Sequence, residues 1–70
     1  MTQTDRASLA TAQLRADALN LADKLESLTR LATEALRLGN HVEALGYLEC
    51  LPQTRAGLTV YCSDLVRKSA

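Results

Sequence analysis

Apolar residues recur along the first half of the chain at alternating steps of three and four positions. A straight α-helix places residues with this spacing in one stripe along a single face. The pattern therefore predicts one long helix over about residues 5–38. The stripe consists of Leu14, Ala18, Leu21, Leu25, Leu28, Ala32 and Ala35.

Gly39 and Asn40 interrupt this pattern, and a second pattern of the same kind begins directly after them. Glycine suits the left-handed position that ends a helix, and Asn40 with Glu43 forms the sequence of a capping box. Because no residue is left for a long loop, we expect a turn at 39–40 and an antiparallel second helix over about residues 41–68. The core residues predicted for this helix are Leu45, Leu48, Leu51, Leu58, Cys62 and Leu65.

Pro52 is the only proline, and it falls inside the second predicted helix. Proline lacks a backbone donor and disfavours the helical conformation of the residue before it. The apolar spacing nevertheless continues across Pro52, with Arg55 as the one exception. We therefore predict a kinked continuation of the helix rather than a break.

The composition agrees with an all-α protein. Hydrophobic residues make up 47% of the 70 residues, with no Phe or Trp and only two Tyr. Leucine and alanine, which dominate the apolar positions, favour helix. The chain is thus predicted to be a single domain, residues 1–70, folded as an antiparallel two-helix hairpin. A chain of this size buries only about 60% of its unfolded surface, so self-association or a helical partner is expected to complete the core.

The charge balance and the termini restrict the classes of partner. Eight basic and eight acidic residues cancel, so no net field attracts phosphate backbones or anionic lipid, and nucleic acid is disfavoured. The N-terminus resembles no signal peptide, and no apolar run approaches the roughly 20 residues of a membrane span. We expect a cytoplasmic protein without a membrane segment.

The residue types needed for catalysis or metal binding do not occur in recognisable patterns. The chain contains no phosphate-binding glycine loop, no paired metal-ligand motif and no nucleophile elbow. Cys50 and Cys62 lie about 18 Å apart on one helix, too far for a disulfide, and with His41 they are too few for a metal site. The sequence predicts no enzymatic activity, no cofactor and no metal.

Several apolar residues lie outside the predicted core, and monomers rarely leave contiguous apolar patches exposed. Tyrosine, which combines a large contact area with a polar tip, is also enriched at interfaces. The residues predicted to contact a partner are Leu9, Ala12, Ala16, Leu19, Leu31, Leu38, Tyr47 and Tyr61.

One family resemblance extends over most of the chain. It rests on Gly39 to Leu48, Gly57, Ser63 to Leu65 and the upstream Ala18, Leu21, Lys24, Leu25 and Leu36. These residues resemble the pattern of the small E-type co-chaperones of the type III secretion needle subunit. The resemblance implies a cytoplasmic helical hairpin that binds a tetratricopeptide-like chaperone, the pair keeping the needle subunit unpolymerised. Pro52 departs from the family pattern.

Two functions therefore follow from the sequence. The first is a co-chaperone or adaptor that buries its apolar face on a helical partner. The second is a homodimeric four-helix bundle, of the kind found among phage and plasmid regulators, that inhibits a host protein or binds RNA. Both are interaction proteins rather than enzymes.

Overall fold

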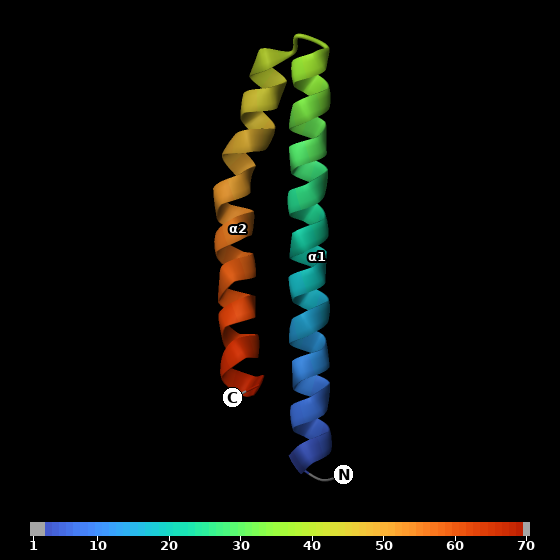
Figure 1. Cartoon of the computed structure of the whole chain (residues 1–70), viewed down its shortest axis with the longest axis vertical. Helices are drawn as coiled ribbons and strands as arrows, with labels where there is room; N and C mark the ends of the chain where they lie inside the picture. The colour runs from blue at the N-terminus through green and yellow to red at the C-terminus, as the bar shows by residue number, and fades with distance from the viewer. Residues whose placement is uncertain (1–2, 70) are drawn as a thin grey trace.

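The computed structural model describes residues 3–69, and side chains from residue 9 to residue 68. The described chain forms two helices, α1 (Gln3–Arg37) and α2 (His41–Ser69), with no strand in this part. They lie side by side and antiparallel, as Figure 1 shows. The predicted all-α hairpin is confirmed. The molecule is a rod of 56 × 16 × 13 Å.

The turn between the helices is built around Gly39. Its φ of 77° lies in the left-handed region, where a Cβ is penalised. The Gly39 N–H donates to the Leu36 carbonyl at 3.1 Å, and the Asn40 N–H donates to the Ala35 carbonyl at 2.8 Å. These two bonds are those of a Schellman motif, in which glycine occupies C′. The predicted position of the turn is confirmed, although α1 ends at Arg37 and Leu38 already belongs to the turn.

The capping box predicted for Asn40 and Glu43 is absent. Neither side chain makes a hydrogen bond within the part of the chain that the structure describes. A capping box requires the N-cap N–H to be free for the glutamate, but the Asn40 N–H is already used by Ala35. Asn40 starts α2 through its carbonyl alone, which accepts a bond from the Ala44 N–H at 3.0 Å.

The glycines of the chain give a paired stability prediction. Gly39→Ala should lower the free energy of unfolding by about 1 kcal/mol, because φ at this position is positive. Gly46→Ala should raise it by a similar amount, roughly 1 kcal/mol, because Gly46 is helical and a Cβ there meets no atom within 4 Å. Urea denaturation of both variants checks the signs. Stabilisation by Gly39→Ala would contradict the turn.

Helix α2 continues through Pro52, as predicted. Proline cannot donate to the Leu48 carbonyl, four residues earlier, so one helical hydrogen bond is missing. The axis of α2 bends partway along its length, whereas α1 is nearly straight (Figure 1). The bend lets the lower part of α2 remain beside α1.

The helices meet along positions that we call the seam. Its members repeat at steps of three and four on both helices, and all are buried or half-buried. In α1 they are Thr11, Leu14, Ala18, Leu21, Leu25, Leu28, Ala32 and Ala35; in α2 they are Ala44, Tyr47, Leu51, Thr54, Leu58, Tyr61 and Leu65. The predicted stripe of α1 is therefore confirmed in full.

The most buried seam positions are occupied by small residues. They are four alanines and one threonine: Ala18, Ala32, Ala35, Ala44 and Thr54. Residues that are equally far in sequence from the turn lie at the same height along the two antiparallel helices. Tyr47 therefore lies at the height of Ala32 and Tyr61 at the height of Ala18, so that a large residue is opposite a small one. At the level between them, a Cβ on Gly57 would lie 3.4 Å from the Leu21 Cδ1 atom.

Three residues predicted in the core of the second helix lie outside it. Leu45 and Leu48 are 57% and 43% exposed, and Cys62 is exposed as well. The seam uses Ala44, Tyr47 and Tyr61 instead, each one position earlier. This register places the small Ala44 at the level of Ala35, and it gives half-buried positions to the two tyrosines, whose apolar ring and polar hydroxyl suit the boundary between core and solvent.

Candidate interaction surface

Among the described residues, no three His, Cys, Asp or Glu side chains gather where they could hold a metal ion. The surface hollow formed by Pro52, Arg55, Ala56 and Thr59 has a volume of about 390 Å³, but all four residues come from α2 and it lies open to solvent. Neither described helix is long and apolar enough to cross a membrane.

The hairpin has two broad faces, one on each side of the seam. A step of one residue rotates a position by about 100° around a helix. Because α1 and α2 are antiparallel, the residues that directly follow a seam residue in the sequence lie on the same side of the hairpin in both helices. The residues that directly precede a seam residue lie on the opposite side in both helices.

The side one step beyond the seam is mostly apolar, and we call it the apolar face. From α1 it contains Ala12, Arg15, Leu19, Ala22, Glu26, Thr29, Thr33 and Leu36; from α2 it contains Leu45, Leu48, Pro52, Arg55, Thr59, Cys62 and Val66. Only three of these side chains are charged. All except the half-buried Ala22 are exposed to solvent in the isolated hairpin.

The threonines of the apolar face use their hydroxyl protons within their own helix. The Thr29 hydroxyl donates to the Leu25 carbonyl, Thr33 to Thr29, and Thr59 to Arg55, each at 2.9 Å. The donor of each hydroxyl is thereby satisfied four residues earlier in the helix. What remains available to a partner at these positions is the methyl group and an oxygen that can only accept a hydrogen bond.

The opposite side, one step before the seam, is polar and we call it the polar face. Its residues are Ala10, Gln13, Asp17, Asn20, Lys24, Ser27, Leu31 and Glu34 from α1, and Glu43, Gly46, Cys50, Gln53, Gly57, Val60 and Asp64 from α2. Asp17 accepts a hydrogen bond from Gln13 at 3.0 Å within this face. The hairpin thus has one water-compatible side and one side that water solvates poorly.

The structure places the predicted interface residues in five separate regions. Ala12 and Leu19 lie on the apolar face. Leu9 and Ala16 are also exposed, but their spacing puts them on the outer edge of α1, away from α2. Leu31 and Leu38 are both exposed: Leu31 lies on the polar face, and Leu38 lies in the turn. Tyr47 and Tyr61 are half-buried in the seam, where the hairpin itself already uses part of their contact area.

The main apolar residues absent from that prediction come from α2. Leu45, Leu48, Cys62 and Val66 lie one step beyond the seam and are all exposed. The pattern 45, 48, 52, 55, 59, 62 and 66 has the same alternating spacing as the seam itself. Spacing alone therefore cannot distinguish the core residues of α2 from those of the apolar face. The distinguishing signal is which of the two stripes complements the alanine-rich stripe of α1.

No protein-family model, curated protein or solved structure matches the sequence.

Proposed function

We propose that this hairpin is a non-enzymatic protein–protein interaction module that buries its apolar face on a helical protein. The observation that carries the proposal is the asymmetry of the rod. The apolar face presents leucines, alanines and back-bonded threonines along both helices and carries three charged side chains, against five on the polar face. A helix or helix pair laid along the rod would remove this surface from water.

The small interior supports the same proposal. No large side chain of the described residues is fully buried, because each leucine of the seam is covered from one side only. Two helices leave the flanks of such residues open, and further helices on the apolar face would cover them. The free energy of folding would then depend on association.

The resemblance to the E-type co-chaperones of type III secretion gives this module a specific role. In that role, the helical partner is a tetratricopeptide-like chaperone in the cytoplasm, and the pair keeps a polymerising subunit soluble. The confirmed hairpin is compatible with the role.

The test is affinity capture from cells of the source organism with the tagged chain as bait. Leu48→Glu places a charge on the apolar face, whereas the control Val42→Glu places the same charge at an 86% exposed position outside it. We expect the wild type and Val42→Glu to retain the same helical protein, and Leu48→Glu to lose it at least tenfold. Equal capture by all three baits would refute the proposed function. Identification of a tetratricopeptide protein by mass spectrometry would support the co-chaperone role.

A further inference from the structure

We infer that the apolar face binds a second copy of this chain, giving a four-helix bundle in which both turns lie at the same end. The inference rests on the proposed function, because it names the helical protein that covers the same face: a second copy of this chain, in place of the tetratricopeptide-like chaperone of the co-chaperone role. It uses three observations: the distribution of apolar residues along the face, the positions of two opposite charges, and the dimensions of the rod.

A twofold axis parallel to the rod places α1 of one copy over α2 of the other, antiparallel. Each level of α1 then faces the same level of α2. The levels follow from the seam, in which Ala35 lies beside Ala44 and Leu14 beside Leu65. Leu36 would meet the Leu45 level of the second copy, Leu19 the Thr59 to Cys62 level, and Ala12 the Val66 level. Apolar residues therefore meet apolar residues next to the turn and toward the open end, and the charged Glu26 and Arg55 lie between these two regions.

The opposite arrangement, with the turns at different ends, matches the face less well. In it, α1 lies over α1 and α2 over α2 of the second copy. The apolar cluster next to the turn, Leu36, Leu45 and Leu48, would then face the open end of the other hairpin rather than the same cluster. The charges decide against this arrangement, because Arg55 lies at the middle of the α2 part of the face (45–66) and would face Arg55 of the second copy.

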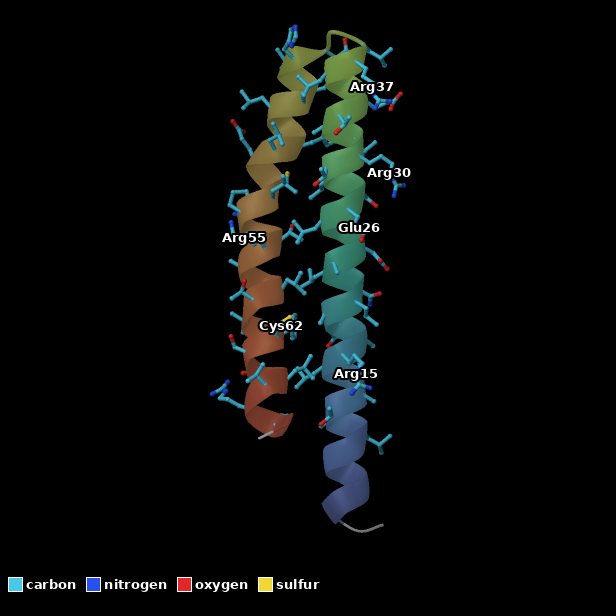
Figure 2. All side chains as sticks on the ribbon, viewed as in Figure 1. Arg15, Glu26, Arg30, Arg37, Arg55 and Cys62 are labelled. Carbon is cyan, nitrogen blue, oxygen red and sulfur yellow. The ribbon has the colours of Figure 1, made fainter. Side chains whose placement is uncertain are left out.

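The charges within the face are complementary in this arrangement. Glu26 and Arg55 lie at nearly the same level but on opposite outer edges of the hairpin, as Figure 2 shows. They do not pair with each other; the one ion pair among side chains 9–68 joins Arg67 to Asp64. Rotation about the twofold axis brings Arg55 of the second copy to the edge where Glu26 lies. Two symmetric Glu26–Arg55 pairs would form at the rim of the interface.

The remaining charge and the area are compatible with the bundle. Arg15 lies near the open end, where its long side chain can reach solvent while its methylene groups cover apolar surface. The face that both helices share runs from Ala12 to Leu36 of α1, about 36 Å at 1.5 Å per residue, so that with the 16 Å width of the rod its projected area is about 600 Å² on each copy. A standard stable interface buries about 800 Å² of accessible surface on each partner, and side chains that project from the face give it more accessible surface than its projected area.

The test is a charge-reversal cycle measured by sedimentation equilibrium at low salt. Glu26→Arg and Arg55→Glu, made singly, put like charges at both rim pairs and should each raise the dimer Kd roughly tenfold. The double variant restores opposite charges and should return the Kd to within about threefold of the wild type. The matched control Lys24→Glu reverses a charge on the polar face and should leave the Kd unchanged.

A distance measurement checks the arrangement independently. Spin labels on Asn40→Cys, with Cys50→Ser and Cys62→Ala, should lie within roughly 25 Å of each other, because neighbouring helices are only about 10 Å apart. A distance near the 56 Å length of the rod would refute the proposed arrangement. A wild-type chain that stays monomeric at about 100 µM, or a double variant that fails to recover, would overturn the second-copy inference. Partner capture through Leu48 would still decide the proposed function separately.

Discussion

Ala32→Leu should be strongly destabilising, with a loss of about 1–3 kcal/mol in the free energy of unfolding. Ala32 is only 2% exposed and lies at the level of Tyr47, where α1 and α2 approach closely. Leucine and alanine have similar helix propensities, so the cost arises from packing rather than from the backbone. Either the tyrosine ring leaves the seam or the helices separate.

Ala16→Leu is the matched control for this variant. It makes the same substitution in the same helix at an exposed position, and it should change the midpoint temperature by little. Thermal unfolding followed by circular dichroism, at equal protein concentrations, should show a decrease of about 5–20 °C for Ala32→Leu alone. Similar midpoints for both variants would mean that the seam is not closely packed at Ala32.

The sequence predicts α1 more completely than α2, and the reason lies in the composition of the two stripes. In α1, leucine and alanine occupy nearly every seam position, so hydrophobicity alone identifies the buried side. In α2, the seam includes two tyrosines and Thr54, while Leu45, Leu48 and Cys62 lie on the apolar face. Hydrophobicity alone therefore does not identify which side of α2 is buried.

Thr54 illustrates why hydrophobicity is an incomplete guide to this core. It is buried, and its hydroxyl donates to the Cys50 carbonyl at 3.2 Å. A threonine whose hydroxyl bonds to its own helix buries a small, mostly apolar surface at little cost. Its neighbour Arg55 occupies the apolar face, which explains why Arg55 interrupts the core pattern predicted for α2.

The position of the turn was predictable because it depends on local chemistry. The positive φ of residue 39 favours glycine, and the two helical patterns leave only residues 39 and 40 between them for a turn. The capping box was not predictable in the same way. Whether the Asn40 N–H is free depends on the Schellman bond to Ala35, which forms only once the helix before it has ended.

The register of α2 also determines which residues are left for binding. A one-residue rotation moves Leu45 and Leu48 from the interior to the surface and moves Tyr47 in the opposite direction. Tyr47 and Tyr61 thereby become part of the hairpin's own packing. Leu31 and Leu38 remain outside both the seam and the apolar face, so a bundle of two copies would still expose them to a further protein.

Leu19→Glu should weaken association by about 2 kcal/mol, since a buried apolar contact is replaced by a carboxylate that must lose its hydration. Leu19 is 59% exposed in the isolated hairpin and lies on the apolar face. The far-ultraviolet circular dichroism of the variant should remain helical, because the position lies outside the seam.

Val60→Glu is the matched control for this variant, because Val60 is 60% exposed but lies on the polar face. Light scattering over a dilution series should show dissociation of Leu19→Glu at concentrations where the wild type and Val60→Glu remain associated. Tyr61→Ala should differ from both: it removes a half-buried ring from the seam, so the midpoint temperature of unfolding should fall together with association. If Leu19→Glu and Val60→Glu associate equally, the apolar face is not the interface, because equal exposure with different placement would then have equal consequences.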